Sequence, residues 1–174
     1  MRFDQFEVAI PQSKEKDGYC ILDDKQVFTI RIHNHSDARC NANIKLDGKD
    51  IGTFRLNPKQ CSELEHPVGS TGRFTFFKSG TLKAIVAGIN NVPSELLGLL
   101  KVKFIPERLS SGNYTGGKIG LSGKSNQVYG KAPPMNVDED KAVTINLRIV
   151  CDSPSGSSAP LPVKSRETPV PPPL

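Results

Sequence analysis

The sequence of 174 residues contains no tryptophan, few aromatic residues (6%) and no long apolar run. A transmembrane helix needs about 20 consecutive apolar residues, so we expect no membrane span. The lack of tryptophan disfavours a glycan-binding protein, because sugar faces are usually bound by exposed aromatic rings. Polybasic blocks are also missing. The net charge of +5 is spread along the chain, which makes nucleic-acid binding an unfavoured function.

The sequence also lacks a Cys-x-x-Cys pair and the apolar N-terminal run of a secretory signal. Because Asp4 and Glu7 interrupt the N-terminus, we expect a cytoplasmic protein; export by a non-classical route and assembly into a particle stay open. In a reducing compartment the four cysteines, at positions 20, 40, 61 and 151, are expected to be buried free thiols. A chain of this size buries roughly 70% of its unfolded surface, so we expect no cofactor, disulfide or structural metal.

Glycine and proline are plentiful, with 15 and 14 copies, which indicates many turns and few long helices. Apolar and polar residues alternate over residues 26–33 and 42–46, as they do in half-buried strands. Asp47-Gly48 then predicts a type I′ hairpin turn, because both of its central residues need positive φ. Further strands are predicted over residues 61–65, 73–77, 81–89, 98–105 and 142–150.

Roughly seven to nine short strands predict an all-β protein, a single antiparallel β-sandwich of jelly-roll or immunoglobulin-like type. We expect this domain to span residues 1–151, followed over residues 152–174 by a disordered tail rich in proline and serine. The core is predicted to hold the inward-facing residues of the best strands. These are Phe28, Ile30, Ile32, Ile44, Leu46, Phe54, Val102, Phe104, Ile145 and Leu147.

Residues 107–141 form a long connection rich in glycine, serine and asparagine. Loops of this length in a compact domain are commonly functional, so we expect this one to contact a protein partner or a second copy of the chain. In the alternative interpretation, the loop folds back on the sandwich as a lid. The candidate partner-binding residues are its apolar and aromatic side chains, Tyr114, Ile119, Leu121, Val128 and Tyr129.

Two short motifs match part of a functional pattern. Gly123-Lys124-Ser125 matches the end of a phosphate-binding loop, but Lys118 stands where that loop has its first glycine and no helix is predicted to follow. A glycine-rich surface loop is therefore the preferred interpretation. In the tail, the stretch from Arg166 to Pro172 has the basic-x-x-Pro-x-x-Pro spacing bound by polyproline-binding domains, although a plain tail is preferred.

His33 and His35 are two residues apart and would project from one face of an extended strand, which suits two nitrogen ligands of a metal ion. Cys40, Cys61 and His66 could complete such a site. The spacing of Cys61 and His66 is similar to the ligand loop of blue copper proteins, but no methionine follows the histidine as that loop requires. A structural or surface histidine pair is therefore favoured. The alternative is a metal-binding protein or metalloenzyme that uses His33, His35 and His66.

A resemblance to a known group rests on two segments. Residues 120–127 read Gly-Leu-Ser-Gly-Lys-Ser-Asn-Gln, and residues 143–150 read Val-Thr-Ile-Asn-Leu-Arg-Ile-Val. The chain resembles small uncharacterised bacterial β-rich proteins in which a Gly-Leu-Ser-Gly-x-Ser-x-Gln segment precedes a closing Thr-Ile-x-Leu-Arg strand. The resemblance covers about residues 26–150 and implies a β-rich fold but no activity.

No nucleophile with a neighbouring base, complete ligand set or intact cofactor loop is evident in the sequence. We therefore expect that the protein is not an enzyme. We expect a binding or structural module that acts through protein–protein contacts or self-association. Metal binding through the histidines is the first alternative, and a glycan-binding sandwich is the second.

Overall fold

The computed structural model describes residues 1–78, 95–108, 129–151, 169 and 171–172. This part of the chain is all-β, apart from the single-turn 3-10 helix η2 (Glu139–Lys141), as predicted. Its strands are β1 (Arg2–Phe3), β2 (Phe6–Ala9), β3 (Lys14–Lys16), β4 (Tyr19–Leu22), β5 (Ile30–Asn34), β6 (Cys40–Leu46), β7 (Lys49–Leu56), β8 (Cys61–Leu64), β9 (Leu99–Pro106) and β10 (Val143–Cys151).

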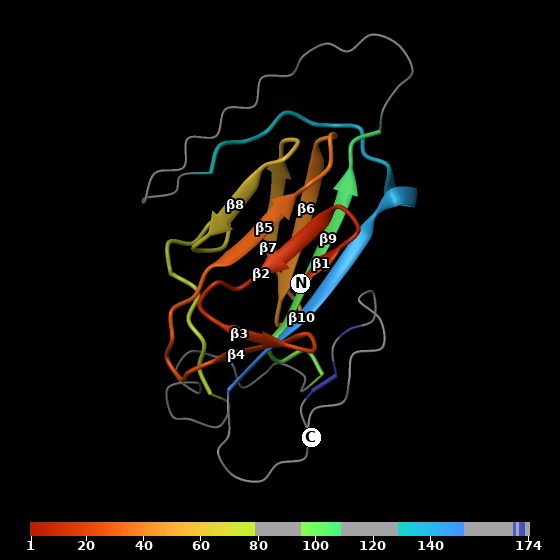
Figure 1. Cartoon of the computed structure of the whole chain (residues 1–174). Coiled ribbons are helices and arrows are strands. Elements are labelled where there is room, and N and C mark those ends of the chain that lie inside the picture. The colour runs from red at the N-terminus through yellow and green to blue at the C-terminus, as the bar shows by residue number, and fades with distance from the viewer. Residues whose placement is uncertain (79–94, 109–128, 152–168, 170, 173–174) are drawn as a thin grey trace.

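The strands form two sheets, one in front of the other in Figure 1. The smaller sheet has the order β1-β2-β5-β8, and the larger has the order β3-β4-β10-β9-β6-β7. The faces that the two sheets turn toward each other supply one continuous hydrophobic core. Phe6 of the small sheet stacks on Phe104 of the large sheet, with ring centroids 4.7 Å apart, so aromatic packing joins the two layers directly.

The prediction of a wholly antiparallel arrangement is wrong at one pair. β4 lies parallel to β10, with Tyr19 opposite Arg148 and Leu22 opposite Cys151. Parallel neighbours need a long connection, and here the chain from residue 23 to residue 142 lies between the two strands. β10 is consequently an interior strand, bounded by β9 on one side and β4 on the other.

The predicted hairpin is confirmed: β6 and β7 pair antiparallel around Asp47 and Gly48. The φ angles of these residues are 53° and 75°, as a type I′ turn requires. The strands predicted over residues 61–65, 98–105 and 142–150 are also present, as β8, β9 and β10. Residues 73–77 make only an isolated bridge, between Thr75 and Val27. The strand predicted over 81–89 lies outside the described residues.

The predicted core is confirmed except at one position. Nine of the ten predicted core residues are buried, whereas Leu46 is only partly buried at the edge of the core. The pairing of β6 with β7 shifts register between Ile44 and Lys45, where β7 has one additional residue, Ile51, but β6 stays in register with β9 through Leu46. Leu46 therefore keeps the inward side that alternation predicts and is only partly buried because it ends the strand at the margin of the core.

The cysteines depart from the predicted set of buried thiols. Cys20 and Cys40 are buried free thiols, but Cys61 is exposed and Cys151 is only half-buried. Cys61 begins β8, which lies at the edge of the small sheet, and its side chain is on the outer face. Of the predicted tail, the structure describes residues 169 and 171–172.

Candidate metal centre

The two histidines predicted as metal ligands lie together on the outer face of the small sheet. Along β5, Ile30 and Ile32 are buried. The next residue, His33, faces outward. His35 follows β5 by one residue and returns to the same side, because side chains alternate along an extended chain. The residue opposite His33 on β2 is Glu7, which brings a carboxylate beside the two imidazoles.

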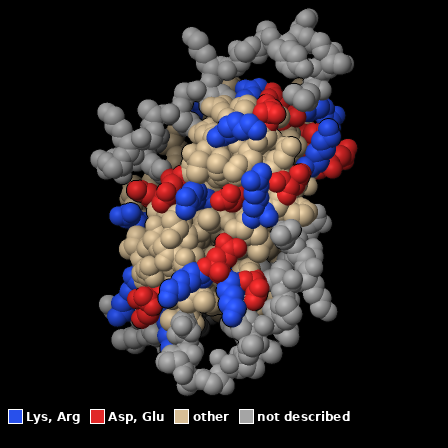
Figure 2. Space-filling model, viewed as in Figure 1, with Lys and Arg blue, Asp and Glu red and all other residues tan. Residues whose placement is uncertain are grey.

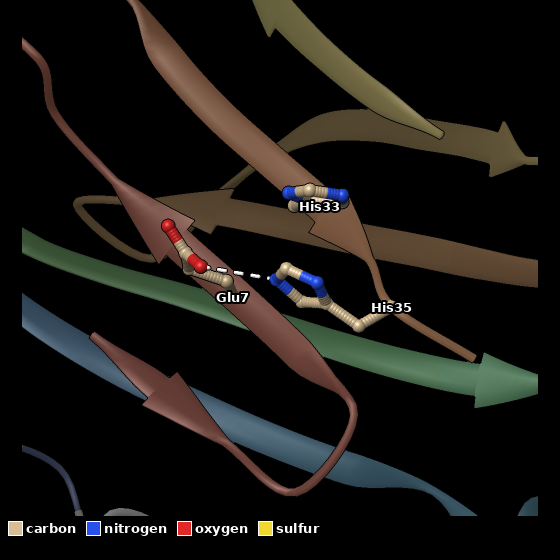
Figure 3. Close-up of side chains that lie close together, drawn as sticks. All are labelled: Glu7, His33 and His35. Atoms are coloured by element: carbon tan, nitrogen blue, oxygen red, sulfur yellow. Dashed lines mark hydrogen bonds and ion pairs between the residues drawn. The ribbon is translucent and has the colours of Figure 1, made fainter. Parts of the chain in front are cut away.

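These three side chains converge (Figure 3). One possible ligand atom from each residue lies within 4.8 Å of the others. His35 Nε2 is 3.0 Å from Glu7 Oε2, and the rings of His33 and His35 stack with centroids 3.7 Å apart. Ligands about 2.1 Å from a tetrahedral ion stand roughly 3.4 Å from one another, so small side-chain rotations would give coordination distances.

The electrostatics of the cluster favour the protonation states that metal ligands need. The hydrogen bond from His35 lowers the pKa of Glu7, and burial opposes this shift only in part. Burial lowers the pKa of His33, and the neighbouring His35 lowers it further. At neutral pH Glu7 is therefore ionised and His33 is neutral, and in these forms they donate electron pairs to a cation.

The other predicted ligands divide into one near residue and two distant ones. Cys61 is directly opposite His33 in the pairing of β5 with β8, so both side chains leave the same face of the sheet. Cys40 is completely buried in the core, where burial raises the pKa of its thiol to about 12. His66 is not part of the ligand cluster found among the described residues, and its ring contacts Tyr129.

The sequence alone does not identify Glu7 as a candidate ligand, because Glu7 reaches the histidines only through the pairing of β2 with β5. The strand around it has only four residues, too few to show a clear alternation. The one signal in the sequence was the pattern Phe6-Glu7-Val8, in which an acidic residue separates two apolar ones.

Of the predicted partner-binding residues, the structure describes only Tyr129. Its ring meets Phe54 edge-on, with centroids 5.0 Å apart, and its hydroxyl donates a hydrogen bond to the carbonyl of His66. Tyr129 therefore packs against the protein itself, as in the lid interpretation of this loop. Tyr114, Ile119, Leu121 and Val128 lie outside the described residues, as does the Gly123-Lys124-Ser125 motif, so partner contact by the loop stays a prediction.

The surface around the cluster carries charges of both signs. Figure 2 shows basic and acidic side chains interspersed on this face, without a continuous basic patch. Several of them are paired, including Lys59 with Asp37 and the N-terminal amine with Glu15. Among the described residues, the exposed large apolar side chains are Val27 and Val68, neither of which offers an aromatic ring to a sugar.

Comparison of the chain with protein-family models, curated proteins and solved structures gives no match. The resemblance of residues 26–150 to small bacterial β-rich proteins therefore stays a prediction. No helix among the described segments is long and apolar enough to cross a membrane. The function is accordingly inferred from the geometry of the chain itself.

Proposed function

We propose that this protein is a β-sandwich module that binds a divalent transition-metal ion through Glu7, His33 and His35, without catalysing a reaction. The observation that carries the proposal is the convergence of two imidazoles and one carboxylate within 4.8 Å. This geometry favours the metal-binding alternative over a histidine pair with a purely structural role.

The donor set indicates which metal would bind. Imidazole nitrogens suit zinc, copper, iron and nickel, whereas magnesium and calcium prefer sites made of oxygen ligands alone. Two histidines and one carboxylate leave at least one coordination position for water or another group. Zinc is our first choice, because it needs no redox partner and accepts nitrogen, oxygen and sulfur ligands in one tetrahedral site.

The location of the cluster supports binding rather than catalysis. His35 and Glu7 keep 23% and 34% of their side-chain surface exposed, and both belong to the open outer face of a sheet. Catalytic sites usually lie in concave cavities that exclude water. The pocket described below is lined by none of the three ligands.

Metal titration of the purified full chain tests the proposal. We expect one equivalent of Zn²⁺ to bind, with release of protons below about pH 6.5, where a metal competes with histidine protonation. His33→Asn should weaken binding by at least about 10-fold, since changing even outer partners of a site commonly costs about 10–100-fold. His66→Asn is the matched control and should bind as the wild type does. Equal affinity in the wild type and His33→Asn would refute the proposal.

Cys61 provides a second measurement on the same site. If its thiolate occupies the open position, the Co²⁺-loaded protein should show a sulfur-to-metal charge-transfer band that Cys61→Ser removes. If water occupies that position, both proteins should lack the band while keeping the affinity for the metal. Either result leaves the three-residue site in place and defines its fourth ligand.

Self-association is a second candidate function, favoured by the position of β7. This eight-residue strand is at the edge of the large sheet, and exposed edges can pair with another chain. Part of the edge is already occupied, because Val68 donates a hydrogen bond to the carbonyl of Ile51. Light scattering at several concentrations, with and without Zn²⁺, separates self-association from metal binding. A mass that stays at one chain throughout would exclude self-association.

A further inference from the structure

A pocket of about 410 Å³ lies between the ends of several strands and the C-terminal residues. Its walls include the aromatic rings of Phe28, Phe76 and Phe77. The wall also contains Cys151, where β10 ends, and Pro172, 21 residues further along the chain. The chain therefore leaves the large sheet at this pocket and returns to the same pocket near its C-terminus.

Of the three charged residues in the pocket wall, Asp47, Lys78 and Arg148, two have side chains that are already engaged with backbone groups. The guanidinium of Arg148 donates to the carbonyls of Leu97 and Glu95, and the carboxylate of Asp47 accepts from the amide of Gly98. The surface left for a ligand is consequently formed mainly by the aromatic rings and aliphatic side chains. Such a surface suits an apolar ligand that needs few polar contacts.

A hydroxyl group beside the pocket provides a specific polar contact. Tyr19 of β4 is 2% exposed, and its hydroxyl donates a hydrogen bond of 2.8 Å to the carbonyl of Pro171. Proline-rich segments adopt polyproline II conformation, in which carbonyl groups point outward without internal partners. Domains that bind such segments combine an aromatic groove with donors to these carbonyls. Here the pocket wall supplies the rings, and Tyr19, which bonds to the residue before Pro172, supplies the donor next to it.

We propose that this pocket belongs to a binding site for proline-rich segments and that the protein's own C-terminal segment binds there within the same chain, with Pro172 forming part of the pocket wall and Pro171 bonded to Tyr19. The segment is rich in proline, with the sequence Pro-Val-Pro-Pro-Pro-Leu at positions 169–174. A proline-rich chain loses little conformational entropy on docking. Tethering adds to this, because a short linker holds the segment at a local concentration on the order of millimolar.

The interaction differs from the one expected of the tail motif between Arg166 and Pro172. There the tail would be a ligand for a separate polyproline-binding domain. Here the protein carries both the ligand and its receptor, and the tail occupies the site unless it is displaced. The inference does not depend on the metal site, because none of the metal ligands lines this pocket.

Peptide binding tests the proposal. All described strands end by residue 151, so a chain that ends at residue 168 retains the core. A fluorescent peptide with the sequence of residues 169–174 should bind this shortened chain. It should bind the full chain at least 10-fold more weakly, because the chain's own segment already lies against the pocket. A peptide with alanine at each proline should not bind. Failure to bind the shortened chain, or equal affinity for both chains, would overturn the proposal.

Two tyrosine variants keep the test decisive. In the shortened chain, Tyr19→Phe removes the donor to the proline carbonyl and should weaken peptide binding several-fold. Tyr129→Phe is the matched control: its hydroxyl bonds to His66, away from the pocket wall, and binding should be unchanged. In the full chain, Tyr19→Phe should accelerate tryptic cleavage after Arg166 relative to the wild type and Tyr129→Phe. Unchanged binding and cleavage in Tyr19→Phe would contradict the proposal even if the shortened chain proved unstable.

Discussion

Single residues of this protein serve both fold and site, and the stacked imidazoles of His33 and His35 are the clearest example. Their rings are 3.7 Å apart, so two simultaneous positive charges would repel strongly. The carboxylate of Glu7 bonds to His35, while burial and the neighbouring His35 lower the pKa of His33. Without a metal ion, this pair therefore makes the native state sensitive to acid.

We predict that the metal-free protein loses stability between pH 7.5 and pH 5.5, in part through His33. The pKa of His33 in the folded protein is lower than its ordinary value of 6.5, so the unfolded chain takes up a proton more readily. The free energy of unfolding therefore falls as the pH drops through 6.5 toward the lower, folded pKa. Urea midpoints at the two pH values should differ less in His33→Gln than in the wild type. An equal loss in both proteins would contradict this assignment.

Phe104 joins the two sheets through its stack with Phe6, and its side chain is completely buried. Phe104→Ala should lower the free energy of unfolding by about 3–5 kcal/mol, because it removes apolar contacts and leaves a cavity. Val68→Ala is a surface control, with Val68 52% exposed, and should change stability by no more than about 0.5 kcal/mol. Urea unfolding measures both changes, and similar values for the two variants would contradict the proposed role of the stack.

At the scale of elements, the sequence predicts what depends on neighbouring residues. The hairpin from β6 to β7 follows from alternation and from Asp47-Gly48, and so does one buried face of β5, β9 and β10. Burial on the second face of β9 and β10, as at Asn146 and Arg148, does not follow from alternation. The strands β1 to β4 could not be predicted in this way, because they have two to four residues each, and β2 and β4 join their sheets through the later strands β5 and β10. The same limit applies to the site: His33 and His35 are visible in sequence, but Glu7 joins them only through sheet pairing.

The segment that leads into β9 depends on one glycine. Gly98 has a φ of +70°; its carbonyl accepts a hydrogen bond from the amide of Ile149, and its own amide donates to the carboxylate of Asp47. A Cβ atom at this position would stand 2.3 Å from the carbonyl oxygen of Ile149, which belongs to the backbone of β10. Neither the turn conformation nor the close approach to β10 tolerates a side chain.

We therefore predict that Gly98→Ala is much more destabilising than Gly69→Ala. Gly69 also has positive φ (+80°), but a Cβ there would meet nothing within 4 Å. Gly69→Ala should cost about 1–2 kcal/mol from backbone strain alone, whereas Gly98→Ala adds a backbone clash and weakens two hydrogen bonds. Thermal unfolding of both variants measures the difference. Equal melting temperatures would show that β10 moves freely away from Gly98.

For the whole molecule, the N-terminal strands cover edges that would otherwise be exposed. β2 pairs with β5 in the small sheet, and β4 pairs with β10 in the large sheet. β3 is a short edge strand with the sequence Lys14-Glu15-Lys16, all exposed, and charged edges resist pairing with other chains. The N-terminus thus covers one side of β5 and one side of β10 and leaves the short strands β1 and β3 at the outer edges.

Deletion of residues 1–24 should consequently cause association. The variant would expose one side of β10 and one side of β5, and both strands carry many apolar residues. We expect a concentration-dependent increase in mass by light scattering relative to the full chain. Deletion of residues 152–174 is the control. It removes no described strand, so the number of chains per particle should stay that of the full-length protein. If the N-terminal deletion variant is monodisperse and contains the same number of chains per particle as the full-length protein, this role is contradicted.

The parallel pairing of β4 with β10 also determines when the protein can finish folding during its synthesis. Some 120 residues separate the end of β4 from the start of β10. At roughly 5–20 residues per second, a ribosome needs about 6–24 s to make them, and until then β4 has no inner partner. Although β4 is made before most other strands, it is thus among the last to gain its inner partner, and during this interval its unpaired edge is open to a chaperone at the ribosome exit.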